Sequence, residues 1–340
     1  MSVTRRRFVA GSLAAVPFAL AGPRALAQSP TTLKISHQFP GGTIEQGDFR
    51  DRLVRKFAAD VEKKTNGGLK FEIYPNSSLV KVNSQFSALR KGALDMSLVP
   101  LSYAGGEVPE TNIGLLPALV PSYEIGSKWK NADVGKLLSQ ILADKGVVVV
   151  TWIWQAGGVA SRGKPVVTPD DAKGLKIRGG SREMDMMFKD AGASVLSLPS
   201  NEIYAAMQTG AMDAALTSST SLISFRLEEV AKALTSGRGK SYWFMFEPLM
   251  MSKQVFDKLP KAQQDAIMSV GAELEKFAVD SAKADDVAVA DVYAKKGAKV
   301  ADLDDAALAK WQVLAKPVWK DYADKNENCA KLLAAAQKLL

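Results

Sequence analysis

Short alternating runs and stretches with four-residue periodicity follow each other through the first hundred residues of the chain. Leu33 and Ile35 alternate with polar neighbours over 32–36, which predicts a half-buried strand. Apolar residues then recur every four positions over 49–61, which predicts a helix. The same two patterns return over 69–98. Strand–helix–strand order predicts an α/β domain with a mainly parallel sheet, in which ligands bind beyond the carboxyl ends of the strands.

The pattern changes in the second half in a way that predicts a second domain. A continuous apolar run over 147–154 indicates a buried strand, and Gly157-Gly158 then breaks it, so we expect the chain to cross into the second domain there. From Lys261 to about Lys295 helix formers dominate without a proline, which predicts one long or kinked helix. A helix of that length is natural as a strut that spans two domains, and a last helical segment follows from 305 to 340.

The first 27 residues predict a signal peptide that is not part of the fold. Basic residues precede a short apolar run, and Ala25-Leu26-Ala27 gives a small-x-small cleavage pattern before Gln28. The paired arginines with Phe8, in Arg5-Arg6-Arg7-Phe8, resemble a twin-arginine signal, and an ordinary Sec signal with extra arginines is the alternative. The apolar run is shorter than the ~20 residues of a membrane span. We therefore expect a soluble protein exported to the periplasm.

Composition and charge exclude several functional classes. The formal net charge of +8 falls to 8 − 4 = +4 without the four arginines of the predicted signal peptide, and no basic cluster with interleaved aromatics favours nucleic acid. His37 and Cys329 are the only residues of their kinds, so the chain has no conventional zinc set and no disulfide. The sequence also lacks a dinucleotide fingerprint, a P-loop and a nucleophile elbow. We expect no cofactor, no metal and no enzymatic activity.

Several segments of the mature chain resemble one family of exported proteins. Residues 170–178, Asp-Asp-Ala-Lys-Gly-Leu-Lys-Ile-Arg, are similar to the D-x-K-G-L-K-x-R signature of TRAP (tripartite ATP-independent periplasmic) transporter solute-binding proteins of the DctP type. Residues 202–213 are similar to that family's E-x-Y-x-A-L-Q-x-G-x-x-D block. Shorter matches occur in the same order at 64–67, 89–96, 116–117 and 259–260. The resemblance covers essentially the whole mature chain.

The resemblance implies a two-lobed α/β periplasmic binding protein fold with hinge strands and a long helix that spans both lobes. We assign 28–154 with about 243–282 to the first lobe, and about 155–242 with 283–340 to the second. Such proteins close on a ligand, usually a carboxylate, and deliver it to small and large TRAP membrane subunits without chemistry of their own. The alternatives are a binding protein of an ABC importer, which the 170–178 block argues against, or a ligand-sensing partner of a sensor kinase.

Arg178 is the leading candidate for ligand binding. It ends a short predicted strand, and its planar fork of donors grips a carboxylate with two parallel bonds. The Gly179-Gly180-Ser181 turn and the helix start beside it add backbone N–H groups. The resemblance implies that this arginine makes the main salt bridge to the ligand. The alternative is a surface arginine that pairs with an acid such as Asp171.

Polar residues at other strand ends are further candidates. The resemblance implies polar contacts from Gln38 and Ser181, and from Thr217, which stands where many family members have Asn, with Ser218 beside it. For Thr217 and Ser218 the alternative is that their hydroxyls cap the helix that follows. Lys81 stands where some sugar-acid binders have an acid, and a solvated lysine is the alternative.

Three aromatic residues near the predicted domain junctions are candidates for the cleft wall. Tyr103, Trp154 and Trp243 either face the ligand or pack in the core and hinge. His37 is interpreted as a structural residue at a strand end. Part of the family has a second arginine near the position of Gly158, whereas this chain has Gly157-Gly158 there and Arg162 further on, and this departure leaves the identity of the acid open.

Overall fold

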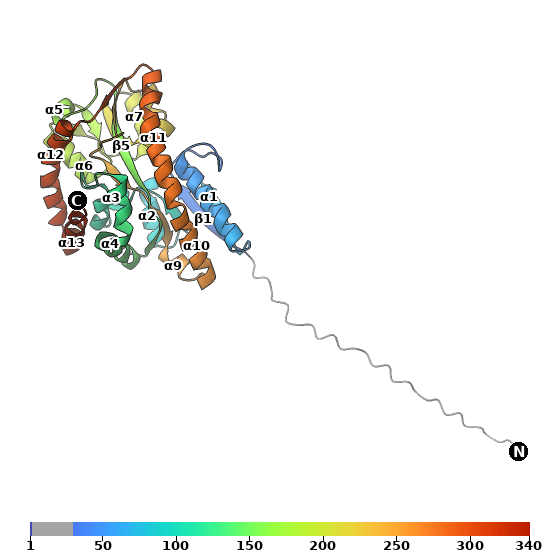
Figure 1. Ribbon diagram of the computed structural model, residues 1–340. Coiled ribbons are helices and arrows are strands. Elements are labelled where there is room, and N and C mark those ends of the chain that lie inside the picture. The colour runs from blue at the N-terminus through green and yellow to red at the C-terminus, as the bar shows by residue number, and fades with distance from the viewer. Residues whose placement is uncertain (2–29) are drawn as a thin grey trace.

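The computed structural model describes Met1 and residues 30–340 (Figure 1). The predicted signal peptide, 1–27, lies outside the described residues apart from Met1. Among the helices that are described, none combines the length and apolar character that crossing a membrane requires. Two lobes are built around separate sheets, as predicted.

The first lobe has a five-stranded sheet in the order β2-β1-β3-β11-β4. β1 lies parallel between β2 and β3, which confirms the strands expected from alternation, whereas β11 enters antiparallel between β3 and β4. The antiparallel strand comes from a distant part of the sequence, so its place follows from the return of the chain from the second lobe. The strand bounds are β1 Thr31–His37, β2 Leu69–Tyr74, β3 Met96–Leu98, β4 Val147–Thr151 and β11 Leu249–Ser252.

Helices cover this sheet with their apolar faces. In α1 (Phe49–Lys64) the predicted four-residue series is buried, including Phe49 and Leu53, and the side chain of Asp48 caps the helix by accepting from the backbone N–H of Arg50 at 2.9 Å. The other helices of this lobe are α2 Val82–Arg90, α3 Tyr123–Lys128, α4 Asp133–Asp144, α9 Lys253–Phe256, α10 Lys261–Glu273 and the short 3-10 turns η1 Leu101–Ala104, η2 Pro109–Leu115 and η3 Trp129–Asn131.

The second lobe has a mixed sheet in the order β12-β9-β5-β8-β6-β7, with β10 paired to β5. The strands are β5 Trp154–Ser161, β6 Lys176–Arg178, β7 Ser194–Val195, β8 Ala214–Ser218, β9 Ala233–Ser236, β10 Phe244–Phe246 and β12 Lys299–Asp302. The helical segments are α5 Pro169–Ala172, α6 Arg182–Asp190, α7 Ile203–Gln208, α8 Ser219–Ser224, η4 Ser200–Glu202 and η5 Leu227–Glu229. β6 and β8 lie parallel, so their carboxyl ends meet at one edge that faces the first lobe.

The lobes are joined by crossing strands and a long helix. The chain leaves through β4 and β5 and returns through β10 and β11. The helix expected over 261–295 is present as α10 and α11 (Glu275–Lys295), with a break at Leu274. α11 runs past both lobes (Figure 1). Ala278 belongs to the core of the first lobe and Tyr293 to that of the second, so α11 is the predicted strut.

The C-terminal segment is shared between the lobes. α12 (Asp305–Ala323) buries Trp311 in the second lobe and Tyr322 in the first. α13 (Glu327–Gln337) packs with Leu332 and its neighbours on the core of the first lobe, against α4. The sequence-based division assigned all of 283–340 to the second lobe, whereas the apolar face of α13 lies on the first.

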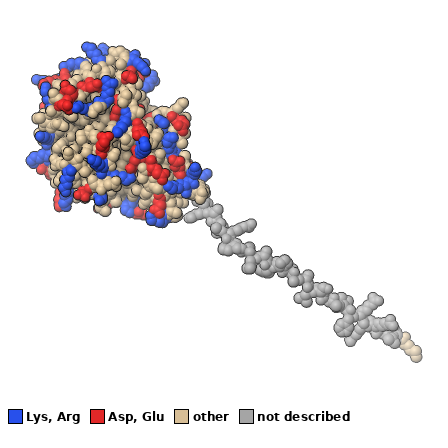
Figure 2. Space-filling model, in the orientation of Figure 1, with Lys and Arg blue, Asp and Glu red and all other residues tan. Residues whose placement is uncertain are grey.

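The visible surface carries both signs of charge side by side. Figure 2 shows lysine and arginine interspersed with aspartate and glutamate over the face in view. Among the described residues, several charges form pairs one helical turn apart, such as Lys261 with Asp265 and Lys276 with Asp280. A mixed surface of this kind favours solubility and gives no continuous basic stripe on the face in view.

Candidate ligand-binding site

Arg178 is buried at the carboxyl end of β6, with 2% of its surface exposed. Its Nε donates to the carbonyl oxygen of Leu198 at 3.0 Å, Nη1 to that of Leu216 at 2.8 Å, and Nη2 to the hydroxyl of Tyr103 at 2.8 Å. All three acceptors are neutral, and no carboxylate among residues 30–340 forms an ion pair with this guanidinium. The alternative of a surface arginine paired with Asp171 is therefore wrong: that carboxylate caps α5 and pairs with Lys164.

The guanidinium of Arg178 keeps two of its five N–H donors free of the contacts described. One remains on each terminal nitrogen, since Nη1 and Nη2 each make a single bond. Burial of a cation that forms no direct ion pair is costly unless an anionic partner arrives. The site is thus complementary to an anion that accepts from both terminal nitrogens.

The turn after Arg178 lies directly against its guanidinium. Gly180 has φ +96°, and a Cβ there would lie 2.7 Å from Nη1 of Arg178. The backbone N–H of Gly179 donates to Oδ1 of Asp185 at 2.9 Å, which fixes the turn. The hydroxyl of Ser181 caps α6 by accepting from the N–H of Met184 at 3.1 Å and donates to the carbonyl of Leu115. Glycine at 180 is required because both the backbone conformation and the close approach exclude a side chain.

Tyr103 reaches this site from the opposite lobe. It lies in η1 and packs against the core of the first lobe. Its hydroxyl oxygen accepts from Nη2 of Arg178 and from the backbone N–H of Ser200 at 3.0 Å. With both lone pairs engaged, the hydroxyl proton of Tyr103 is left to donate. The two lobes therefore meet at Arg178, the leading candidate for ligand binding.

A cavity of about 210 Å³ adjoins the Arg178 turn and is lined from both lobes. Its wall includes Asp185, whose Oδ2 accepts from the hydroxyl of Ser197 at 2.7 Å. Burial raises the pKa of Asp185, whereas the hydrogen bonds from Ser197 and Gly179 and the nearby positive charge of Arg178 oppose the rise. The lining residues are Asn83, Ser102, Tyr103, Gly180, Ser181, Arg182, Asp185, Ser197, Leu198 and Pro199. Polar groups around a small cavity suit a short solute with several oxygen atoms.

The remaining polar candidates lie in different surroundings. Gln38 is buried at the end of β1, and neither atom of its amide has a hydrogen-bond partner within the described chain. Thr217 is buried on β8, one residue beyond the carbonyl that holds Arg178. Ser218 caps α8 and faces Arg50 of the first lobe. Lys81 is exposed ahead of α2 and forms no ion pair with any described residue.

The two tryptophan candidates are packed rather than exposed to the cleft. Trp154 lies in the core of the first lobe with its ring centroid 4.9 Å from that of Trp129 and 5.2 Å from that of Phe246. Trp243 belongs to the core of the second lobe, and its Nε1 donates to the carbonyl of Gly179 at 3.2 Å. Trp243 thus supports the Arg178 turn from behind.

His37 is placed as expected for a structural strand-end residue. Its Nε2 lies 3.1 Å from Oδ1 of Asp51 in α1, and its Nδ1 accepts from the backbone N–H of Phe39 at 3.3 Å. Hydrogen bonds from His37 and Arg55 lower the pKa of Asp51 against the effect of burial. Both ring nitrogens are engaged, so the imidazole ties the end of β1 to α1.

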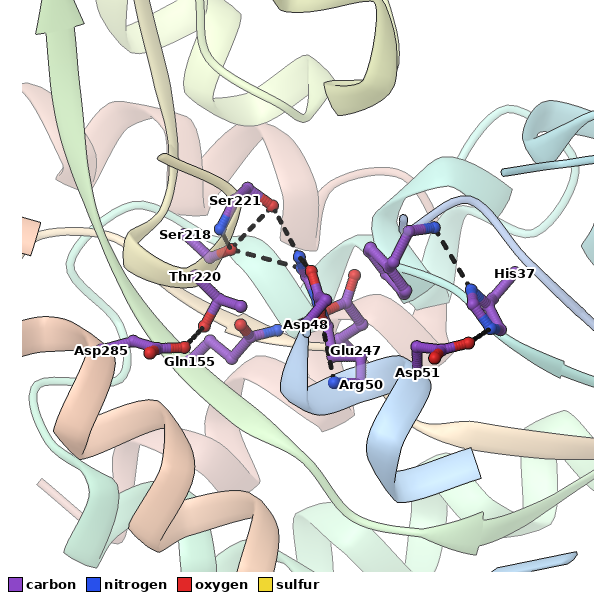
Figure 3. A network of polar contacts seen from close by, with 11 residues as sticks. His37, Asp48, Arg50, Asp51, Gln155, Ser218, Thr220, Ser221, Glu247 and Asp285 are labelled. Carbon is purple, nitrogen blue, oxygen red and sulfur yellow. Dashed lines mark hydrogen bonds and ion pairs between the residues drawn. The ribbon is translucent and has the colours of Figure 1, made fainter. Parts of the chain in front are cut away.

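A second buried arginine was missed by sequence reasoning. Arg50 is 0% exposed, and its guanidinium lies 3.6 Å from the ring centroid of Phe39. It donates to both oxygens of Asp48, to Glu247, and to the hydroxyls of Ser218 and Ser221 (Figure 3). These five contacts engage all five N–H donors. Arg50 is therefore saturated by protein groups, in contrast to Arg178.

Two lobes joined by crossing strands, with a buried arginine at the edge where they meet that forms no ion pair with residues 30–340, define the class of two-lobed solute-binding proteins. The chain belongs to the bacterial extracellular solute-binding protein family 7 (DctP), whose profile matches residues 43–326. The prediction of this family and of its fold is thereby confirmed.

Three relatives illustrate the similarity. A solute-binding protein of Albidiferax ferrireducens is 70% identical over 333 residues, which cover 97% of each chain. The C4-dicarboxylate-binding periplasmic protein DctP of Rhodobacter capsulatus is 26% identical over 94% of this chain and 95% of its own. A crystal structure of a TRAP periplasmic solute-binding protein from Rhodoferax ferrireducens, with bound malonate, has a TM-score of 0.89 and 72% identity, covering 90% of this chain and 98% of that one.

Proposed function

We propose that this protein captures a small organic acid between its lobes and delivers it to the small and large membrane subunits of a TRAP transporter. The observation that carries the proposal is Arg178, a buried cation whose three hydrogen-bond acceptors within residues 30–340 are all neutral. A ligand carboxylate that accepts from both terminal nitrogens supplies the missing charge with bidentate geometry. Capture then requires no covalent step, so the chain acts as a binding protein and not as an enzyme.

The ligand class is a short carboxylic acid, with malonate as the first choice. The relative that shares 72% identity was crystallised with bound malonate, and a cavity of about 210 Å³ suits an acid of that size. Beyond Arg178, we propose that the free hydroxyl proton of Tyr103 and the unpartnered amide of Gln38 contact the acid. Ser181 lines the cavity, and Thr217 follows Leu216, whose carbonyl oxygen accepts from Arg178; we propose both as wall residues.

Export to the periplasm completes the proposal. Residues 1–27 have the charge, the apolar run and the cleavage pattern of a signal peptide, with paired arginines of the twin-arginine type. Membership of the extracellular solute-binding family supports this location. The similarity to TRAP binding proteins over 90% of the chain favours this transporter class over an ABC importer or a sensor kinase.

The proposal is tested by Arg178→Lys, with malonate binding measured by isothermal titration calorimetry on the mature protein. Lysine keeps the charge but not the planar fork, so we expect affinity to fall by about 30- to 300-fold, as loss of charge-assisted hydrogen bonds implies. The thermal midpoint without ligand, measured in parallel, separates loss of binding from loss of fold.

Arg238→Lys is the matched control, because Arg238 is an exposed arginine of the second lobe that pairs with Asp302 at 2.9 Å. We expect it to bind malonate as the wild type does. A wild type that binds no acid from a panel of mono- and dicarboxylates, or full affinity in Arg178→Lys, would overturn the proposed role of Arg178.

A further inference from the structure

The Arg50 cluster joins three parts of the molecule and shares no residue with the lining of the cavity beside Arg178. We define it as Asp48, Arg50, Gln155, Ser218, Ser221 and Glu247 (Figure 3). Asp48 and Arg50 stand at the start of α1 in the first lobe. Ser218 and Ser221 stand at the start of α8 in the second lobe. Glu247 lies between β10 and β11 and Gln155 on β5, so both belong to the crossing strands.

The contacts of Arg50 differ in kind on the two sides of the cleft. Toward its own lobe and the crossing strands, Arg50 forms ion pairs, with Nη2 2.7 Å from Asp48 and Nη1 3.1 Å from Glu247. Toward the second lobe it donates only to neutral hydroxyls, at 3.4 Å to Ser218 and 3.1 Å to Ser221. The two hydrogen bonds to Asp48 and the one to Glu247 therefore keep the arginine in place when the lobes separate, and only the two hydrogen bonds to Ser218 and Ser221 are broken.

The strand β8, which ends at Ser218, also accepts a hydrogen bond from Arg178. The carbonyl of Leu216 on β8 accepts from Nη1 of Arg178, and Ser218 follows two residues later on the same strand. The hydroxyl of Ser218 in turn bonds that of Ser221 at 3.0 Å and accepts from its backbone N–H. One strand end thus contacts the first lobe through Arg50 and positions Arg178, whose own contact with Tyr103 also crosses the cleft.

The start of α8 is fixed on its other side by the strut. Thr220 donates to Oδ2 of Asp285 on α11 at 2.7 Å. The next residue, Asp286, accepts from the hydroxyl of Tyr123 in the first lobe at 2.5 Å. Ser221 therefore meets Arg50 in a defined position and not as part of a mobile loop.

We propose that Arg50, with Ser218 and Ser221, is a closure latch that sets how long the ligand stays bound without touching the ligand. The latch contacts form only when the two lobes meet, so they stabilise the closed state relative to the open one. A ligand leaves through the open state, so the latch slows dissociation and leaves the encounter rate unchanged. The proposal rests on capture between the lobes, as proposed above.

The test is Ser221→Ala, which removes one hydroxyl of the latch and leaves Ser218 to cap α8. Stopped-flow tryptophan fluorescence with malonate measures both rate constants. We expect the dissociation rate to rise about 3- to 10-fold, the scale of one neutral hydrogen bond, with the association rate unchanged. Ser224→Ala is the matched control, because Ser224 lies in the same helix and its hydroxyl has no partner within the described chain. An unchanged dissociation rate in Ser221→Ala, or an equal rise in Ser224→Ala, overturns the latch.

A second measurement separates failure of the latch from failure of the proposed ligand. Spin labels at Lys136→Cys in the first lobe and Lys173→Cys in the second, both exposed positions, report the distance between the lobes by double electron–electron resonance. We expect Ser221→Ala to lower the closed fraction, with or without malonate, and Ser224→Ala to match the wild type. If malonate does not bind the wild type, this distance distribution alone decides: equal distributions in both variants, or no closed population in the wild type, refute the latch.

Discussion

Two buried arginines in this protein show how the acceptors around a side chain, and not the residue type, determine its role. Arg50 meets two carboxylates and two hydroxyls, which use all its donors. Arg178 donates to two carbonyl oxygens and one phenol oxygen. Two of its N–H donors remain without a partner in these contacts, and none of the three acceptors carries a negative charge. Only the second arrangement is completed by an anionic ligand.

The sequence predicted a functional role for Arg178 but not the burial of Arg50, and the difference has a physical reason. Arg178 follows a short strand and precedes two glycines, a local signal that also occurs in the family motif. Arg50 lies next to Phe49 on an amphipathic helix, where the periodicity predicts a solvated polar face. Its burial results from the approach of the second lobe, which no local pattern contains. For the same reason the bond between Tyr103 and Arg178 was not predicted, although Tyr103 was a candidate.

Gly180→Ala is expected to weaken malonate binding by about tenfold or more. The new Cβ would lie 2.7 Å from Nη1 of Arg178, so the guanidinium must move, and the positive φ adds about 1 kcal/mol of backbone strain. Calorimetric titration measures the affinity. Gly174→Ala is the control, because it has φ +76° with no atom within 4 Å of the added Cβ. Gly174→Ala has the backbone strain without a steric contact, so this variant should lose stability but keep its affinity for malonate. Equal losses of affinity in Gly180→Ala and Gly174→Ala would contradict the proposed effect on Arg178.

At the scale of elements, local patterns predicted most of what the structure contains. Strands β1 to β3 follow from alternation, α1 from four-residue periodicity, β4 from a continuous apolar run, and the helical stretch after Lys261 from a run of helix formers without a proline. The antiparallel entry of β11 and the packing of α13 on the first lobe were not predicted. Both join segments far apart in sequence, so periodicity identifies the element but not its partner.

Replacement of Gly271 in α10 by alanine is expected to destabilise the protein, although a Gly→Ala change inside a helix usually stabilises it. In a helix interior that change normally stabilises by about 0.5–1 kcal/mol. Here the Cβ would lie 2.4 Å from the carbonyl oxygen of Val150 on β4, so the helix must shift away from the sheet. We expect Gly271→Ala to lower the free energy of unfolding by about 1–3 kcal/mol in urea. Met268→Ala, at an exposed position of the same helix, should stay within about 0.5 kcal/mol; a stabilised Gly271→Ala would show that the contact is loose.

At the scale of the whole molecule, the contact between lobes includes an acid with an unusual proton affinity. Burial raises the pKa of Glu247 to about 7, with Asp48 adding to the rise and Arg50 and the amide of Gln155 opposing it. The carboxyl binds a proton in the folded protein over a pH range in which the unfolded chain has released it. Its contribution to stability is therefore complete below its ordinary pKa and is lost as the pH rises toward 7.

Glu247→Gln is expected to remove this pH dependence. Between pH 5 and 8 the free energy of unfolding of the wild type should lose about 1–3 kcal/mol from Glu247, measured against the variant in urea at each pH. Burial also raises the pKa of Asp286, to about 6, and this carboxyl is common to both proteins, so the difference isolates Glu247. Glu202→Gln, at an exposed position, is the control and should follow the wild type. Parallel pH profiles for Glu247→Gln and the wild type would contradict the assignment.

The packing of α13 on the first lobe has a consequence for the order of folding. The core of that lobe combines residues from β1 and α4 with Cys329 and Leu332 near the end of the chain. The first lobe begins with β1, which is synthesised early, but its core also needs α13. That helix is synthesised only after the whole second lobe. Contacts of such long sequence separation slow folding, because a long loop must close before they form. We therefore expect the first lobe to complete its core only after α13 has been synthesised, and not in the order of synthesis of the two lobes.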